Sequence, residues 1–164
     1  MPLIKDGAVR ADGWIYLGDD DDPADGQSVI IDYARWHAGD AAIAGHNGPL
    51  GIRMRSDQAP ELIKDDLGRF DVIALEFLGI ADGRSFSHAR ILRDRMGYGG
   101  ELRAVGGVLE DQIFFMRRCG IDAFELDPGR DIGRAMAALT QFSAPYQASS
   151  DGLEPATSRR HSGR

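Results

Sequence analysis

The chain has 164 residues, 43% of them hydrophobic and 27% charged, and carries a formal net charge of -7 at pH 7. This length fits a single domain, and the negative charge argues against general nucleic-acid binding, which requires a basic surface that neutralises phosphates. No apolar run approaches the roughly 20 residues of a membrane span, and the first residues lack the basic head and apolar stretch of a secretion signal, so we expect a cytoplasmic protein without a membrane partner.

The first part of the chain, residues 1–46, predicts an irregular segment. It contains an extended run at Trp14, an acidic loop from Asp19 and a stretch from Ile30 that favours a helix. No repeat is visible in it. Regular patterns begin only at Leu50, so we expect an irregular N-terminal segment followed by the regular part of the same domain.

Four strand-helix units follow one another from residue 50 onward. Apolar residues at period two predict each strand, and apolar residues three and four apart predict each helix. The expected strands begin at Leu50, Asp71, Glu101 and Asp122, and the expected helices at Ala59, Ser85, Leu109 and Asp131. Alternating strands and helices form a parallel sheet joined by right-handed crossovers. We therefore predict one α/β domain over residues 1–146 and a disordered tail over residues 147–164.

The predicted strands alternate apolar and charged residues, whereas parallel strands covered by helices on both faces are apolar almost throughout. Side chains alternate between the two faces of a sheet, so one face is expected to be apolar and the other charged. The charged set comprises Arg53, Arg55, Glu76, Glu101, Arg103 and Glu125. Burying isolated charges is costly, so these side chains need partners, water or a ligand.

Two architectures explain such a sheet. One is half of an eight-stranded (β/α) barrel, whose strands send one set of side chains to the helices and the other into the interior. The other is a flavodoxin-like open sheet in which some alternation is accidental. A half-barrel exposes its interior, so we expect a homodimer, or another protein, to cover the charged face. Phe114 and Phe115 lie away from the apolar stripe of the third helix and also suggest a contact surface.

Ligands of parallel α/β proteins gather at the carboxyl ends of the strands, so polar residues in and after the strands are candidates for a site. After the second strand, Arg84 stands where an anion would meet a guanidinium and backbone donors. The simpler explanation is a turn shaped by Asp82, a helix cap at Ser85 and a surface arginine. The candidate ligand-binding residues are Arg53, Glu76, Asp82, Arg84, Arg103, Asp111, Gln112 and Glu125.

No catalytic residue can be assigned from these candidates. Arg103 with Glu76 or Glu125 forms either an acid/base pair or a cross-strand ion pair, and the lack of a nearby nucleophile favours the ion pair. Asp111 in the first turn of a helix is also what the helix dipole favours. The one cysteine, Cys119, excludes an internal disulfide, and no Cys/His cluster has metal-ligand spacing. The sequence implies no metal and no cofactor.

A resemblance to a known family rests on the segment DGRSFSHARILRDRMGYGGELRAVGGVLEDQIFFMRRCGIDAFEL from Asp82 and on LGIRM from Leu50. Both resemble the bacterial family called domain of unknown function nine hundred and thirty-four, over most of residues 30–142. Members are commonly encoded beside sulfite reductase genes and are often labelled probable oxidoreductases of sulfite reduction. The resemblance therefore implies a pathway, and it supplies no catalytic residues.

The resemblance and the absence of cofactor motifs lead us to expect an accessory protein of assimilatory sulfite reduction, within sulfate assimilation and cysteine biosynthesis. It would bind sulfite reductase or its electron donor. The alternative is a small enzyme acting on an oxyanionic substrate at the strand ends, where Arg53, Arg84 and Arg103 bind charge and Glu76 or Glu125 moves protons. A third possibility is a flavin-binding module of flavodoxin type. Whether the protein is an enzyme stays open.

Overall fold

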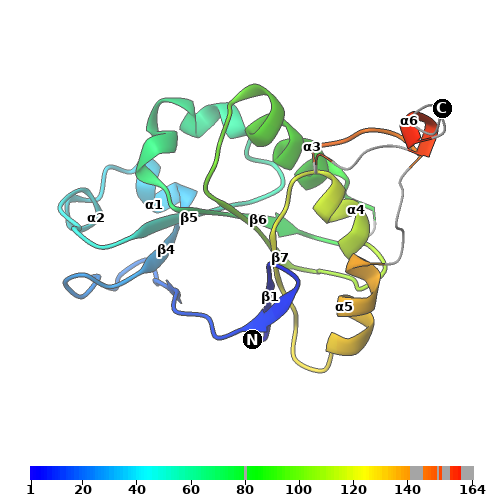
Figure 1. The fold of residues 1–164 in the computed structure, drawn as a ribbon. Coiled ribbons are helices and arrows are strands. Elements are labelled where there is room, and N and C mark those ends of the chain that lie inside the picture. The colour runs from blue at the N-terminus through cyan, green and yellow to red at the C-terminus, as the bar shows by residue number, and fades with distance from the viewer. Residues whose placement is uncertain (80, 141–145, 151, 153–155, 160–164) are drawn as a thin grey trace.

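A computed structural model of the chain describes all residues except 80, 141–145, 151, 153–155 and 160–164 (Figure 1). The strands are β1 Leu3–Lys5, β2 Ala8–Arg10, β3 Ile15–Tyr16, β4 Val29–Asp32, β5 Leu50–Met54, β6 Val72–Phe77, β7 Glu101–Gly106 and β8 Ala123–Glu125. The helices are α1 Tyr33–His37, α2 Ala41–Ala44, the 3-10 helix η1 Pro60–Arg69, α3 Arg84–Arg90, the π-helix η2 Ile91–Arg95, α4 Ile113–Arg118, α5 Ile132–Leu139 and α6 Ala156–Arg159.

One curled sheet contains all eight strands, in the order β2-β1-β8-β7-β6-β5-β4-β3. The strands from β3 to β8 are parallel and follow chain order, and β1 adds antiparallel to β8. A flavodoxin-like sheet has a reversal of strand order in its middle, which this sheet lacks. The parallel α/β fold is therefore confirmed, and of its two forms the sheet has that of the half-barrel.

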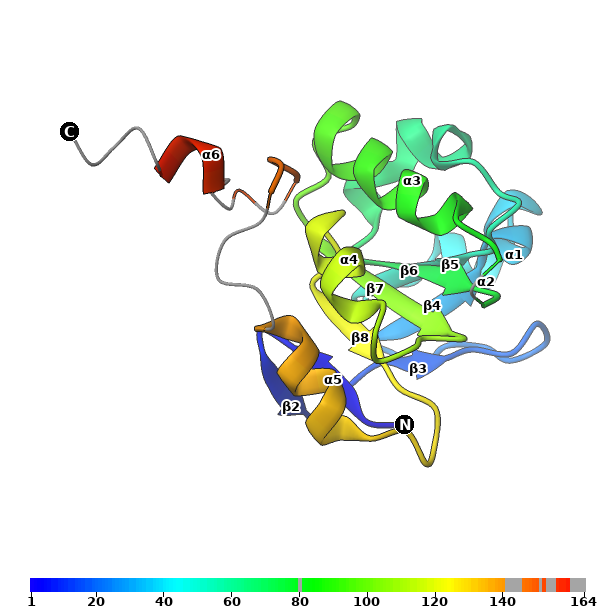
Figure 2. The ribbon, with the colours of Figure 1, turned by 90° about the vertical axis from the view of Figure 1, so that its right-hand side faces the viewer.

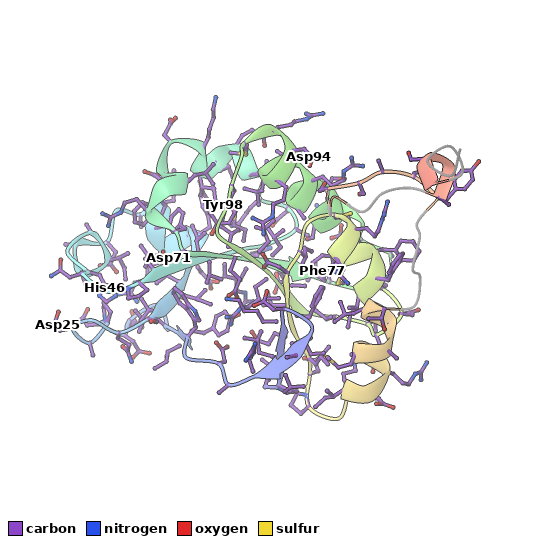
Figure 3. The ribbon with its side chains drawn as sticks, in the orientation of Figure 1. Asp25, His46, Asp71, Phe77, Asp94 and Tyr98 are labelled. Atoms are coloured by element: carbon purple, nitrogen blue, oxygen red, sulfur yellow. The ribbon has the colours of Figure 1, made fainter. Side chains whose placement is uncertain are left out.

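The helices from α1 to α5 cover one face of this sheet, whereas α6 lies apart from it, as Figures 1 and 2 show. The apolar strand residues expected on one face all lie in a single buried core with helical side chains such as Ile63, Leu92 and Ile113. These strand residues are Leu50, Ile52, Met54, Ile73, Leu75, Phe77, Leu102, Ala104, Phe124 and Leu126. Phe77, labelled in Figure 3, meets Phe86 of α3 edge to face, with ring centroids 5.1 Å apart. The predicted two-faced sheet is confirmed.

The expectation of an irregular N-terminal segment was wrong, because residues 1–46 supply four of the eight strands. The helix expected from Ile30 begins only at Tyr33, after β4. Val29 and Ile31 point into the helix-side core, while Ile30 joins an apolar cluster on the opposite face. Three successive β-branched residues that are buried on both faces favour a strand over an amphipathic helix.

Other differences concern element ends. Ser85 does not cap α3, which begins after Gly83, because its buried hydroxyl donates instead to the carbonyl oxygen of Glu76 at 2.5 Å. The third helix begins at Ile113 rather than at Leu109. Half of the predicted disordered tail falls on residues outside the described ranges, and α6 lies within its described part, so the tail and the domain boundary at residue 146 stay predictions. None of the described helices is long and apolar enough to cross a membrane.

Candidate functional site

The charged side chains of the strands lie on the face of the sheet that the helices leave uncovered, which we call the polar face. The register places Arg53 and Arg103 on either side of Ala74, so the two arginines point the same way. Arg53 pairs with Glu76 at 2.8 Å, and Arg103 lies 3.8 Å from Glu125. The structure therefore brings together four of the predicted site residues. Arg55, expected with them, follows the end of β5 and is exposed.

Arg103 is the centre of a buried ionic network. Its guanidinium is fully buried, with Nε donating to Glu101 at 2.8 Å and Nη1 donating to Asp12 at 2.7 Å. Its second terminal nitrogen also donates to Asp12, at 3.2 Å. Burial alone lowers the pKa of Arg103, but the hydrogen bonds to Asp12 and Glu101 and their charges hold that pKa above its ordinary value. The arginine therefore stays charged.

The N-terminal segment closes this side of the polar face. Asp12 lies between β2 and β3, the hydroxyl of Tyr16 donates to Glu125 at 2.8 Å, and Lys5 donates to Glu101 at 2.7 Å. The side chains of Trp14 and Tyr16 pack on the apolar residues of the same face, which are Ile30, Val72, Ala74 and Val105. The expectation that the interior is exposed was therefore wrong for the Arg103 side, because the chain covers it with its own first residues.

Sequence reasoning missed Lys5, Asp12 and Tyr16. The only signals were an isolated acid and an aromatic residue in an extended run, and these have no fixed spacing to the strand residues that they contact. The partners lie 96, 91 and 109 positions away along the chain. Such contacts depend on β1 pairing antiparallel with β8 and on the curl of the sheet, which no local pattern encodes.

The Arg53 side of the polar face is more open. The side chain of Arg53 is 37% exposed. Its Nε lies 3.7 Å from a carboxylate oxygen of Asp32 and makes no hydrogen bond to any described group. Glu76 accepts a hydrogen bond from Nη2 of Arg53. In the ion pairs that the structure describes on the polar face, three cations meet five carboxylates: Lys5, Arg53 and Arg103 against Asp12, Asp32, Glu76, Glu101 and Glu125. An excess of negative charge disfavours binding of an oxyanion there.

Asp82 and Arg84 lie at the carboxyl edge of the sheet and bind each other. Asp82 accepts from the backbone nitrogen, Nε and Nη2 of Arg84, at 3.1, 2.9 and 2.7 Å. Arg84 also donates to Ser56 at 3.0 Å. Hydrogen bonds from Arg84 and Ser56 hold the pKa of Asp82 well below its ordinary range. The carboxylate therefore occupies the donors that an anionic ligand would need, as the simpler explanation of this turn expects.

Asp111 and Gln112 lie apart from both groups, in the turn before α4. Asp111 is exposed and, with Glu110 and Arg134, lines a shallow pocket of about 320 Å³. The amide oxygen of Gln112 is buried and has no hydrogen-bond partner among the described groups. The eight candidate residues thus lie in three separate places. Four lie together on the strands, two form the Asp82–Arg84 pair, and two lie in the turn before α4. Within the described ranges, no group of three or more His, Cys, Asp or Glu residues is arranged to hold a metal ion.

Residues 51–157 match the model of a family described as bacterial protein of unknown function (DUF934). The chain belongs to the DUF934 family. The family match begins later than the expected residue 30 and ends later than residue 142, so it includes part of the tail that was expected to lie outside it. The N-terminal residues that close the polar face of this DUF934 member lie outside the match. No curated protein matches the chain.

Tyr16 supplies a pH-dependent test of the closed polar face in this DUF934 member. Burial raises the pKa of its phenol above the ordinary 10.0, and the nearby Glu125 carboxylate adds to the shift. The folded protein then keeps a proton that the unfolded chain loses, so this contribution to stability is complete below pH 10 and is lost as the pH rises further. Tyr16→Phe is expected to flatten the alkaline fall in unfolding free energy by about 1 kcal/mol per pH unit.

Urea titrations monitored by circular dichroism at roughly pH 8, 10 and 11 measure that slope. Burial also raises the pKa of Tyr98. Its contribution to the pH dependence of stability is the same in the variant and in the wild type. Parallel pH profiles for the variant and the wild type would show that Tyr16 is not buried against Glu125.

Proposed function

We propose that this protein is an accessory protein of assimilatory sulfite reduction, which acts by binding sulfite reductase or its electron donor. The observation that carries the proposal is the occupancy of the polar face. The donors of Arg103 are taken by Glu101 and Asp12, and the Arg53 side carries excess negative charge. A face filled by its own ion pairs is a poor pocket for sulfite, so the protein is better suited to binding a protein than to transforming an oxyanion.

The exposed apolar side chains of the described surface support the same proposal. Phe115 on α4 is 60% exposed and Leu78 is 64% exposed. Aromatic side chains such as that of Phe115 are enriched at protein contact surfaces, whereas a single exposed leucine is common on any folded protein. The choice of pathway rests on the resemblance to a family commonly encoded beside sulfite reductase genes. Together they favour an interaction role in that pathway.

Affinity purification combined with a growth assay tests the proposal. The chromosomal protein is tagged, purified at low salt and assayed for sulfite reductase subunits and activity. A deletion strain is supplied in turn with sulfate, sulfite, sulfide and cysteine. We expect a reductase subunit or its electron donor in the eluate, and growth restored by sulfide or cysteine but not by sulfite. An empty eluate together with normal growth on sulfate would contradict the proposal.

The second candidate is a small enzyme acting on an oxyanionic substrate at the carboxyl edge of the sheet. One observation favours it: Ser56 and Arg84 meet beside a hollow lined by Leu78, Gly79 and residues 81–84. Arg84→Met tests it, because this exposed residue is not part of the core. Loss of growth on sulfate with unchanged stability and unchanged binding of the reductase would favour the enzyme over the accessory role.

Self-association also stays a prediction. The closure of the Arg103 side removes one reason for it, since those charges already have partners within the chain. Size-exclusion chromatography with light scattering over a range of concentrations tests the expected homodimer, and a constant monomer mass would exclude it.

A further inference from the structure

A groove lies on the helical side of the molecule, away from the polar face. It is formed by α3, α4 and residues 146–149 and has a volume of about 650 Å³. Its apolar lining comes mainly from Phe86, Phe114 and Phe115, with Tyr146 at the border. All of these residues fall within the part of the chain that the family model matches.

The groove offers an aromatic surface on a firm support. Phe86 packs on the core residue Phe77, and Phe114 is almost completely buried. Phe115 meets Phe114 edge to face, with centroids 5.7 Å apart, and its own side chain remains 60% exposed. Of the two phenylalanines expected to form a contact surface, only Phe115 therefore presents its ring to solvent. Rigid exposed aromatic rings lose little conformational entropy on binding and often dominate interface energies.

The charged side chains among the described residues that line the groove are both arginines. Arg90 and Arg118 line it, and no carboxylate is found among its described lining residues. The chain as a whole has 26 acidic and 19 basic residues. Arg90 contacts Asp94 at 3.4 Å on the exposed side of the helix, while Arg118 donates to the carbonyl oxygen of Gln147. Two arginines beside an aromatic surface fit carboxylates that flank an apolar side chain.

We infer that this groove binds an acidic segment of a partner protein, which inserts one apolar side chain against Phe86 and Phe115 and places carboxylates beside Arg90 and Arg118. The inference deepens the proposed function and rests on it, since the partner would be sulfite reductase or its electron donor. The aromatic rings supply affinity, and the arginines select an acidic segment over a basic one.

Selection from a random peptide library displayed on phage, with the full-length protein as target, tests the inference whichever partner the groove binds in the cell. We expect enriched peptides in which Asp or Glu flank an aromatic or aliphatic residue. The enriched peptides are then synthesised, and their binding is measured by fluorescence anisotropy. Phe115→Ser and Arg90→Glu are each expected to weaken binding about tenfold or more.

Matched controls separate this groove from the rest of the surface. Leu62→Ser changes an apolar side chain of η1 that is 51% exposed, and Arg69→Glu makes the same charge reversal on an exposed part of η1. Neither residue lines the groove, so both variants should bind the peptides as the wild type does. Peptides without acidic residues, or equal binding by Phe115→Ser and the wild type, would overturn the inference. So would sedimentation that shows self-association lost in Phe115→Ser, because a second copy would then be the occupant.

The two proposals fail in different ways. If tagged Phe115→Ser retains as much reductase subunit as the wild type, the groove assignment is wrong and the accessory role stands. If the wild type retains no reductase or donor while acidic peptides still bind through Phe115, the pathway is wrong and the groove assignment stands.

Discussion

Replacement of Arg103 by methionine is expected to destabilise the protein by about 3–5 kcal/mol, the usual cost of removing one partner from a buried ionic group. The arginine is fully buried and donates to Glu101 and to Asp12, with Glu125 3.8 Å away. Methionine matches much of the volume but leaves Asp12 without its cation and Glu101 with Lys5 alone. Urea unfolding monitored by circular dichroism measures the loss.

Arg69→Met provides the control for that variant, because Arg69 is an exposed arginine of η1. Its replacement should change the unfolding free energy by less than about 0.5 kcal/mol. Arg103→Lys should lie between the two, since one ammonium group cannot reproduce hydrogen bonds to two carboxylates in a fixed plane. A loss below about 1 kcal/mol for Arg103→Met would mean that this side of the polar face is open to water.

A second large effect, about 2–4 kcal/mol, is expected for Arg93→Met. Arg93 lies in η2 and ties this helix to two loops, residues 98–100 and 120–122. It donates to Asp122 at 2.7 Å and to the carbonyl oxygens of Gly120, Tyr98 and Gly100 at 2.9, 2.6 and 2.7 Å. Figure 3 labels Tyr98, whose ring also lies 5.7 Å from the guanidinium. Methionine would leave these acceptors without their donor.

The Arg93→Met loss should depend on pH in a defined direction. Burial raises the pKa of Asp122, and the positive charge of Arg93 opposes that shift. Without the arginine the carboxylate is harder to keep ionised in the folded protein, so the deficit should be largest near neutral pH and smaller in acid, where Asp122 is protonated. Arg95→Met, at an exposed arginine of the same helix, is the control. An equal loss of unfolding free energy at neutral and at acid pH would contradict the role assigned to Asp122.

The two-faced sheet could be predicted from the sequence because it depends on a local rule. Side chains alternate along a strand, so the spacing from Arg53 to Met54, or from Arg103 to Ala104, is enough to assign opposite faces. The strand-helix units could be predicted from equally local patterns. The order of the strands could not, because half-barrel and flavodoxin-like sheets share these units and differ only in how distant strands pair.

The contribution of the N-terminal segment could not be predicted in this way. Its strands are two to four residues long, too short for a periodic pattern to stand out. β1 and β8 are joined by long-range pairing, with Ile4 opposite Phe124. The charges of Arg103 and Glu125 indicated that some partner was required, but they gave no means of choosing between a second copy, another protein and the chain itself.

Of the eight candidate residues, only the four on the strands lie together on one face, and the accessibility expected for Arg103 and Glu125 was wrong. Arg103 and Glu125 lie together as expected, yet they are buried by Asp12 and Tyr16. Arg84 was a candidate for anion binding, and Asp82 occupies its donors instead. The charged residues of the strands are therefore less accessible to a partner than the outer surface around α3 and α4, where Phe115 is exposed.

A double-mutant cycle between Asp12 and Arg103 tests most directly whether the chain closes its own polar face. The unfolding free energies of the wild type, Asp12→Ala, Arg103→Met and the double variant give the coupling between two residues 91 positions apart. Closure predicts a coupling of at least about 1.5 kcal/mol. Additive effects, within about 0.5 kcal/mol, would show that Asp12 does not lie on Arg103 and that the charged face is open.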